Sequence, residues 1–519
     1  MTASVIHEFT LTSLLDELAR SRGDHTAIVC SGARYDFRAL RQRVIKLANA
    51  LGAKGVGPGD RILWMGQNSS HILEGILACA RLGAMICPIN WRQSADEMAF
   101  IIDDFTPKVV FWQDIEIGAD VRVARAKAKH QTAFWFKADE DEGGTEYEAF
   151  LASGSVEDRN RGVAASEPVL VVYTAAFFGT PNGAMLSQNA ILMQDLSVQK
   201  TQQISANTVF LNSGPMFHVG TLMLTLATFH AGGTNVIVRR TEPEELCRLI
   251  HENRCTLAFL VGKTCYEMAQ VNKDRRFDLT CLRSPSYHPE WDEMVTINPR
   301  DFRDTPYGYG QTEVMGIVIW VYYSDNKGRG AHGAVGPLTQ VRIVDPDDRD
   351  VPDGEVGEII MRGPTVMNGY WNRPELNAQR QRNGWHHTND LGRREVDGTI
   401  TFIGPKTQMI KSGAENIYPA EVEGALKKHP AVADAAIIGV PDPRFIQSVK
   451  AIIQLKPGAQ ATPDELIDHC RAVMASYKKP RFVEFAERLP RTQVGAVDYR
   501  ALDATYGGGN YPGGSLRGS

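Results

Sequence analysis

The chain has 519 residues, 43% of them hydrophobic and 23% charged, so it is too long for one ordinary hydrophobic core and at least two domains are expected. Its 56 basic and 61 acidic residues leave a formal net charge of -5, which gives no general attraction to nucleic acid or to an anionic membrane surface. Because no segment approaches the roughly 20 apolar residues of a membrane span and the eight cysteines lack zinc-ligand spacing, we expect a cytoplasmic protein with reduced core thiols that acts on small molecules.

Short apolar runs alternate with amphipathic stretches through most of the chain. The runs Arg61 to Trp64, Lys108 to Trp112 and Val169 to Tyr173 favour buried strands. Helical periodicity over Ser70 to Arg81 and Glu242 to Asn253 favours helices. This alternation predicts an α/β fold with layered, largely parallel sheets.

The later part of the chain changes character twice. Residues 324–356 are rich in Gly, Asp and Pro and predict turns within a β-rich subregion. After Phe402 we expect a compact α+β unit, with helices over 419–428 and 462–474 and strands over 433–440, 450–455 and 481–485. The expected organisation is an N-terminal domain over 1–407, a small mobile C-terminal domain over 408–505 and a disordered glycine-rich tail over 506–519.

Five segments carry a resemblance to a known family. They are 82–92 (LGAMICPINWR), 215–220 (PMFHVG), 309–313 (YGQTE), 384–391 (GWHHTNDL) and 410–423 (IKSGAENIYPAEVE). In this order they resemble the adenylate-forming superfamily of acyl-CoA synthetases, luciferases and peptide-synthetase adenylation domains. The resemblance covers the chain from about residue 10 to 503 and implies an acyl- and adenylate-binding domain followed by a mobile C-terminal domain.

The resemblance implies a nucleotide site in two of these segments. Tyr309 would stack on adenine, with Gly310 in the same turn. Thr312 would hydrogen-bond the α-phosphate, and Glu313 would hold Mg²⁺. Asp390 corresponds to the carboxylate that accepts both ribose hydroxyls of the AMP moiety. The alternatives are an ordinary strand-end turn with a solvated glutamate, and an aspartate that caps a loop.

Three further residues are candidates for thioester formation with CoA. His218 resembles the gate histidine between the acyl pocket and the CoA tunnel, although a lone histidine is usually structural. Gly413 corresponds to the small glycine of a loop that lines the pantetheine path after the C-terminal domain rotates; it could also be a turn glycine with positive φ, and both could be true. Lys411 could assist the anionic centre where the thiolate displaces AMP, or could be a solvated lysine.

The phosphate loop departs from the family pattern. The family reads YTSGTTGxPKG, in which hydroxyls, backbone amides and a lysine surround the β- and γ-phosphates. Residues 173–183 here read YTAAFFGTPNG. The replaced positions are Ala175, Ala176, Phe177, Phe178 and Asn182. Donors are lost and bulk is added where a triphosphate of about -4 charge would lie, so we expect ATP to bind poorly.

The remaining departures point the same way. Residues 489–500 read LPRTQVGAVDYR, with Ala496 where the family has a lysine that bridges the carboxylate and the α-phosphate. Pro405 replaces a ribose-binding arginine, and Gln408 stands at the usual hinge aspartate. Residues 284–287 read Ser-Pro-Ser-Tyr in place of a glycine-rich adenine loop.

These patterns favour a non-adenylating ligase that converts an acyl-adenylate and CoA into acyl-CoA and AMP. A separate adenylating ligase would supply the adenylate. This division resembles the thioester-forming member of a ligase pair of the platensimycin-biosynthesis type. Three alternatives remain open: a full ATP-dependent ligase carrying a disabling Lys-to-Ala change, a catalytically silent adenylate-binding protein, and a full ligase with a replacement cation.

Overall fold

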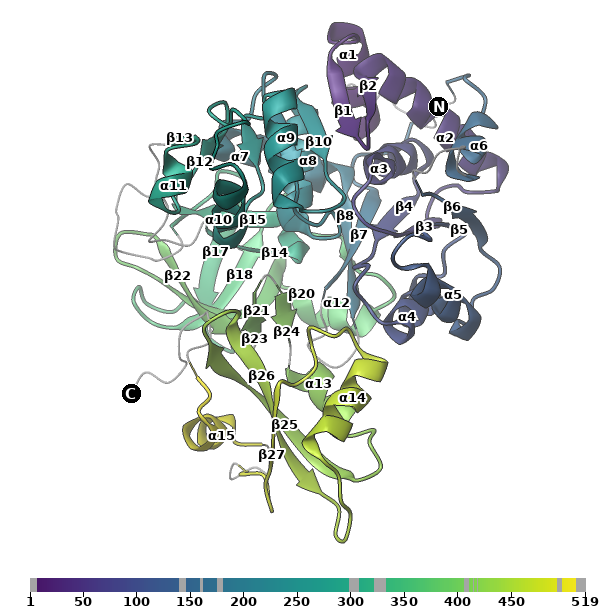
Figure 1. The fold of residues 1–519 in the computed structure, drawn as a ribbon. Helices are drawn as coiled ribbons and strands as arrows, with labels where there is room; N and C mark the ends of the chain where they lie inside the picture. The colour runs from purple at the N-terminus through teal and green to yellow at the C-terminus, as the bar shows by residue number, and fades with distance from the viewer. Residues whose placement is uncertain are drawn as a thin grey trace.

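A computed structural model describes residues 7–139, 146–158, 162–174, 181–297, 308–321, 333–405, 410–413, 415–417, 419–491 and 497–509. Over these ranges the chain forms a large N-terminal part of layered sheets and helices, and a small C-terminal domain beneath it (Figure 1). The mixed α/β class predicted from the sequence is confirmed. All eight cysteines are free, and all but the partly exposed Cys281 are buried. No helix within the described ranges is long and apolar enough to cross a membrane.

The central sheet is mostly parallel and is buried between helices. Its strands, in spatial order, are β19 (Gly369–Tyr370), β8 (Asn182–Ser187), β7 (Pro168–Thr174), β4 (Met85–Pro88), β3 (Arg61–Met65), β5 (Val109–Trp112) and β6 (Phe134–Lys137). The first half of the chain also contributes α2 (Phe37–Ala53), α3 (Ser70–Leu82), α4 (Ala95–Phe105), α5 (Gly118–Lys127) and α6 (Glu146–Ala152). The predicted strands β3, β5 and β7 are apolar and almost wholly buried, as parallel strands covered on both faces must be.

A second sheet lies beside the first. Its strands, in order, are β11 (Leu257–Ala258), β9 (Val209–Asn212), β10 (Thr234–Ile237), β1 (Thr26–Cys30) and β2 (Ala33–Asp36). The other elements of this region are α1 (Leu11–Ser21), α7 (Gln188–Gln202), α8 (Val219–His230), α9 (Pro243–Asn253), α10 (Gly262–Val271), β12 (Arg283–Ser284), α11 (Pro289–Asp292) and β13 (Thr296–Ile297). Because α8 follows β9 after a short loop, its first residues lie at the carboxyl end of a parallel strand, where binding sites of such sheets form.

The predicted β-rich subregion follows in the chain. It contains β14 (Gly308–Gln311), the 3₁₀ turn η1 (Thr312–Val314), β15 (Gly316–Trp320), β16 (Ala334–Val335), β17 (Gln340–Val344), β18 (Gly357–Arg362), α12 (Pro374–Arg380), β20 (Gln381–Arg382), β21 (Trp385–Arg394) and β22 (Ile400–Pro405). All strand pairs in it are antiparallel. In the β21–β22 pair, Asp390 lies opposite Pro405.

The C-terminal domain is a curved sheet with helices on it. It contains β23 (Ile410–Ser412), β24 (Glu415–Ile417), α13 (Pro419–Leu426), β25 (Val432–Asp442), β26 (Ile446–Leu455), α14 (Pro463–Val473), β27 (Phe482–Phe485) and α15 (Tyr499–Tyr506). The two helices and three strands expected after Phe402 are all present, with ends that differ by a few residues. The expected domain boundary at Gln408 lies outside the described residues.

The disordered tail was expected over residues 506–519, but residues 506–509 are ordered. Tyr506 ends α15, and its carbonyl accepts a hydrogen bond from Lys450 Nζ at 3.0 Å. The Gly509 carbonyl accepts another from Gln447 Nε2 at 3.1 Å. Residues 506–509 therefore belong to the C-terminal domain, because their backbone groups cap α15 and bind the sheet. Residues 510–519 lie outside the described part of the chain.

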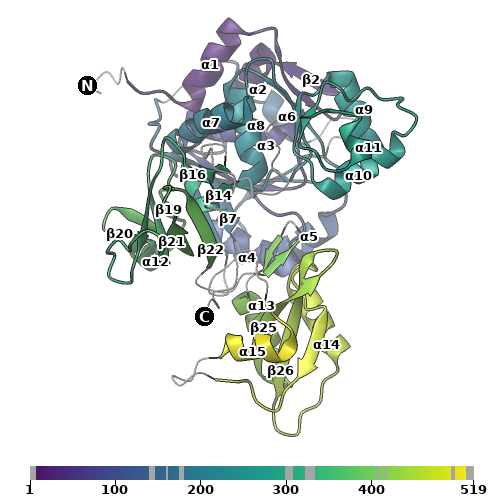
Figure 2. The same cartoon turned by 90° about the vertical axis from the view of Figure 1, so that its left-hand side faces the viewer.

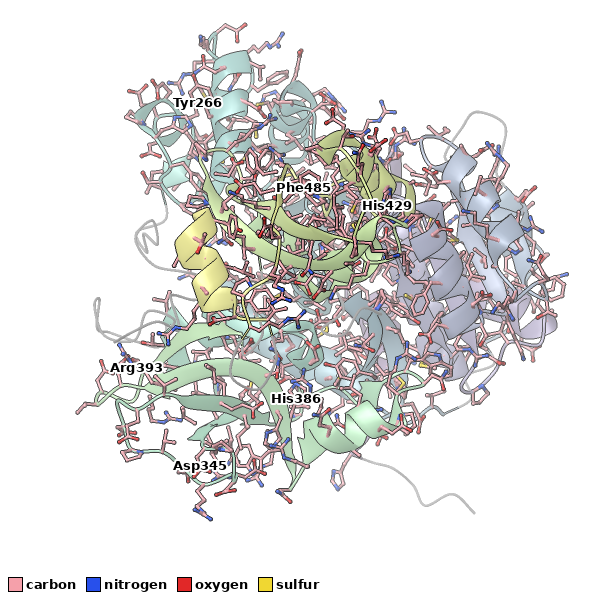
Figure 3. All side chains as sticks on the ribbon, turned by 90° about the horizontal axis from the view of Figure 1, so that it is seen from below. Tyr266, Asp345, His386, Arg393, His429 and Phe485 are labelled. Atoms are coloured by element: carbon pink, nitrogen blue, oxygen red, sulfur yellow. The ribbon has the colours of Figure 1, made fainter. Side chains whose placement is uncertain are left out.

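The C-terminal domain contacts α4 of the N-terminal part. The helix α14 packs against α4, and in both side views the C-terminal domain lies beneath α4 (Figures 1 and 2). Seen from below, the C-terminal domain, with His429 and Phe485 on it, covers the centre of the molecule (Figure 3). The ammonium of Lys478 lies 2.6 Å from a carboxylate oxygen of Glu97 on α4 and 2.6 Å from one of Glu421 on α13. The Lys478 side chain is 4% exposed, so a buried ion cluster joins the two domains.

Candidate functional site

Two strands bring Tyr309 and Asp390 together, as the predicted nucleotide site requires. Tyr309 on β14 donates a hydrogen bond from its hydroxyl to Asp390 Oδ2 at 2.7 Å. Gln311, two residues further along β14, donates its amide to the same oxygen at 2.6 Å. One face of the Tyr309 ring stacks on Phe402, with centroids 5.1 Å apart, so adenine could contact only the other face.

Asp390 is a buried carboxyl group with an altered pKa. Burial raises its pKa to about 6, although the hydrogen bonds from Tyr309 and Gln311 lower it. Its carboxylate bonds to side chains of a neighbouring strand instead of capping its own loop. The group is therefore poised to change charge near neutral pH.

The turn after Tyr309 is tight and its glutamate is buried. A Cβ at Gly310 would lie 1.8 Å from the Gly316 carbonyl oxygen, so only glycine fits there. Thr312 begins the 3₁₀ turn, and Glu313 accepts a hydrogen bond on Oε1 from the Tyr370 hydroxyl at 2.7 Å. Because Glu313 is only 5% exposed, the alternative of a solvated glutamate is wrong. In the described ranges no group of three or more His, Cys, Asp or Glu could hold a metal, so Mg²⁺ at Glu313 would need ligand phosphate oxygens and water.

His218 lies at the start of α8 and faces the C-terminal domain. Its Nε2 is buried, 3.6 Å from Oε2 of Glu415 on β24, and has no hydrogen-bond partner within the described residues. The other Glu415 oxygen, Oε1, lies 3.3 Å from Arg92 Nη1. Glu415 was not predicted as a site residue, although it belongs to the segment 410–423 that carries part of the family resemblance.

The β23–β24 hairpin carries the two other predicted residues. Gly413 has a φ of +61° at its tip, which confirms the turn-glycine interpretation, and its N–H donates to the Phe445 carbonyl at 2.7 Å. A Cβ at Gly413 would contact only the Phe445 ring, at 3.7 Å. Burial lowers the pKa of Lys411, while nearby Glu415 raises it, so Lys411 is not a fully solvated lysine. The hairpin thus places Glu415 against His218, with Lys411 close enough to Glu415 to interact with its charge.

The lysine position of the phosphate loop is occupied by a buried amide. Asn182 Oδ1 accepts a hydrogen bond from Arg373 Nε at 3.1 Å. Arg373 also pairs with Asp104 Oδ1 at 2.8 Å, and Asp104 accepts the Tyr173 hydroxyl at 2.7 Å on its other oxygen. A cation therefore reaches this position from a distant segment, which the sequence did not predict, but a carboxylate already neutralises it. The replaced positions 175–178 lie outside the described residues.

The other departures can be located only in part. In the altered adenine loop, Tyr287 N donates to Asp292 Oδ1 at 3.0 Å, and Ser286 Oγ bonds to the same carboxylate. This loop is held by side-chain contacts within its own region. Ala496 and Gln408 lie outside the described ranges.

Comparison with known proteins gives consistent matches over nearly the whole chain. A family model described as AMP-binding enzyme matches residues 15–371, and one described as AMP-binding enzyme C-terminal domain matches 421–496. An indoleacetate–CoA ligase from Aromatoleum aromaticum is 33% identical over 502 residues, covering 95% of this chain and 98% of that protein. A feruloyl-CoA synthase from Amycolatopsis is 32% identical, covering 92% and 95%. A solved fatty acyl CoA synthetase from Mycobacterium tuberculosis superposes with a TM-score of 0.69 at 25% identity, covering 96% of this chain and 98% of that one.

Proposed function

This chain belongs to the AMP-binding enzyme family, among acyl-CoA ligases, and we propose that it catalyses mainly thioester formation from an acyl-adenylate and CoA. Its ATP-dependent adenylation step is lost or impaired, and a separate adenylating ligase supplies the adenylate. In the retained step the CoA sulfur bonds to the acyl carbon, the bond from that carbon to the phosphate oxygen breaks, and AMP leaves.

The residues around Asp390 fit the AMP moiety. Tyr309 and Gln311 both donate to Oδ2 of Asp390, which leaves Oδ1 as the acceptor for ribose hydroxyls. Phe402 covers one face of Tyr309, which leaves the opposite face of this 6% exposed ring as the one that would stack on adenine. Thr312 follows at the end of the same strand. When bound with phosphate, Mg²⁺ at Glu313 would neutralise charge on the leaving AMP.

The observation that carries the proposal is the position of the β23–β24 hairpin. On this hairpin Glu415 lies 3.6 Å from His218 of the N-terminal domain, Lys411 interacts with Glu415, and Gly413 lies at the tip. Next to Gly413, the Phe445 ring contacts two guanidinium groups, with Arg444 at 4.9 Å and Arg481 at 4.0 Å from its centroid. An aromatic ring with two cations is chemically suited to the adenine and phosphates of CoA.

The groups needed for adenylation are poorly supported by contrast. The amide oxygen of Asn182 accepts a hydrogen bond from Arg373. Because the amide is neutral, it cannot neutralise the charge of a triphosphate. The adenylation lysine of the family is Ala496, so no ammonium is available from that position. Burying the negative phosphates of ATP costs desolvation free energy, which cationic partners normally offset. Positions 182 and 496 provide no such cation.

One contact supports a second candidate, a full ATP-dependent ligase in which Arg373 replaces the lysine. Its guanidinium is held directly at Asn182 and could approach a phosphate. The ion pair with Asp104, whose side chain is 9% exposed, opposes this role because the positive charge is already compensated.

The deciding experiment incubates the purified protein with indoleacetyl- or feruloyl-adenylate and CoA in the absence of ATP. The proposal predicts acyl-CoA and AMP in equal amounts. In a parallel reaction, ATP with the matching free acids should release no pyrophosphate at ordinary ligase rates, on the order of 1 per second. Pyrophosphate release at such rates, abolished by Arg373→Gln, would instead establish the replacement-cation enzyme. Adenylate binding without any product would identify a silent binding protein.

A further inference from the structure

We propose that His218 and Glu415 form a catalytic dyad across the domain interface, in which His218 accepts the thiol proton of CoA and Glu415 positions its ring. The inference rests on the proposed thioester-forming function. It adds a proton acceptor to that step and gives a role to Glu415, a residue outside the nucleotide site.

The first support is the geometry of the two side chains. Nε2 of His218 is buried and lies 3.6 Å from Glu415 Oε2, a few tenths of an ångström beyond a hydrogen bond. Catalytic hydrogen bonds are often long before the ligand is bound and shorten in the complex. A hydrogen on Nε2 directed at the carboxylate would fix the tautomer and leave Nδ1 as the basic atom. Because 45% of the side chain is exposed while Nε2 is buried, the Nδ1 edge is the open one.

The second support is the charge on Glu415. Its two oxygens face two groups of the N-terminal domain, His218 and Arg92. Burial raises the pKa of this carboxyl, but His218, Arg92 and Lys411 together hold it below its ordinary value. Glu415 is therefore ionised at neutral pH and can balance the positive charge that forms on the imidazole.

The third support is that the dyad joins two domains. His218 precedes α8 of the N-terminal domain, whereas Glu415 belongs to β24 of the C-terminal domain. The pair exists only while the hairpin that carries Glu415 is docked on the N-terminal domain. Proton removal from the thiol is then confined to the stage at which the acyl-adenylate is ready to react.

The step balances as a simple acyl transfer. The CoA thiol gives its proton to His218 Nδ1, and the sulfur bonds to the acyl carbon. The electrons of the broken carbon–oxygen bond leave with AMP. Glu415 stays ionised and stabilises the imidazolium, which later loses its proton to solvent.

The test compares Glu415→Gln and His218→Ala with the wild-type protein and with Glu484→Gln. Glu484 is a suitable control because it is a half-exposed glutamate of the same domain, paired with Lys450. Each protein is given acyl-adenylate and CoA over a range of pH, and AMP affinity is measured separately by calorimetry. We expect His218→Ala to lower kcat by roughly 10²-fold or more and to recover activity with added imidazole.

Glu415→Gln should lower kcat by roughly tenfold or more and shift the pH profile, because the imidazole loses its ionised partner while the two cations that face position 415, Arg92 and Lys411, remain. AMP affinity and the Glu484→Gln rate should stay at wild-type values. Wild-type rates and an unchanged pH profile in Glu415→Gln, or an absence of imidazole rescue in His218→Ala, would overturn the dyad while leaving the proposed function intact. A wild-type protein that forms no acyl-CoA would refute the proposed function, and the dyad with it.

Discussion

Replacing Glu97 by glutamine should release the C-terminal domain from α4 without unfolding either domain. Lys478 is held by Glu97 of the N-terminal domain and by Glu421 of its own domain, each at 2.6 Å. In Glu97→Gln the pair with Glu421 remains, so the buried ammonium keeps one carboxylate partner. Glutamine also preserves the capping box with Ser94 at the start of α4. The substitution therefore acts mainly on the contact between domains.

The size of the effect follows from the burial of this contact. A hydrogen bond between charged groups contributes about 1.5–3 kcal/mol, which is roughly a 10- to 150-fold change in the docking equilibrium. Lys478→Met should cost more, about 3–5 kcal/mol, because it leaves two carboxylates buried without a cation. If docking is needed for thioester formation, the rate should fall in the order wild type, Glu97→Gln, Lys478→Met.

The assay is acyl-CoA formation from acyl-adenylate and CoA, with AMP binding measured in parallel. Asp96→Asn is the matched control. Asp96 is the neighbouring residue on α4, it pairs with Lys127, and its side chain is 42% exposed. A pair of that kind contributes about 0–1 kcal/mol. Equal losses in Glu97→Gln and Asp96→Asn, or a parallel loss of AMP affinity, would refute the reasoning.

Three further outcomes are expected. Gly413→Leu should abolish acyl transfer to CoA and leave adenylate affinity nearly unchanged, whereas Gly413→Asn, which tolerates positive φ, should retain part of the activity; equal losses of binding and transfer would indicate misfolding. Since the pKa of Asp390 is about 6 in the folded protein, above its ordinary value, the folded state binds more protons between about pH 4 and 6. Stability should therefore fall, and AMP affinity should rise, as the pH increases through that window, and Asp390→Asn should remove both effects in calorimetry. Ala496→Lys alone should restore little pyrophosphate release from ATP, and full recovery by this change alone would show that the phosphate loop is competent. The combined variant adds Ala175→Ser, Ala176→Gly, Phe177→Thr, Phe178→Thr and Asn182→Lys and should release pyrophosphate.

Local patterns predicted much of the fold. The strands β3, β5 and β7 and the helix α3 were identified because a buried parallel strand is continuously apolar and a helix repeats its apolar positions every three or four residues. The C-terminal domain was identified for the same reason. The last residues of the domain were not, because Tyr506 to Gly509 are ordered by contacts with Lys450 and Gln447 on a distant strand.

The sequence predicted only those site residues that lie in segments matching the family motifs. Tyr309 and Asp390 are 81 positions apart and were paired through the resemblance, not through any local signal. Arg373 lies 191 positions from the Asn182 that it contacts. The pairing of Glu415 with His218 likewise depends on how the domains dock. Such contacts arise from tertiary packing, which residue spacing along the chain does not encode.

The carboxylate of Glu97 makes two contacts, one with the start of its own helix and one with the C-terminal domain. Its Oε2 accepts the backbone N–H of Ser94 at 2.8 Å and so fixes the first turn of α4, while its Oε1 binds Lys478 of the other domain. Separation of the domains would free this side chain and loosen the helix start. Amide hydrogen exchange at Ser94 and the first turn of α4 would then be slow in the docked protein and faster in the undocked one. These amides therefore report the movement of the C-terminal domain without any added label.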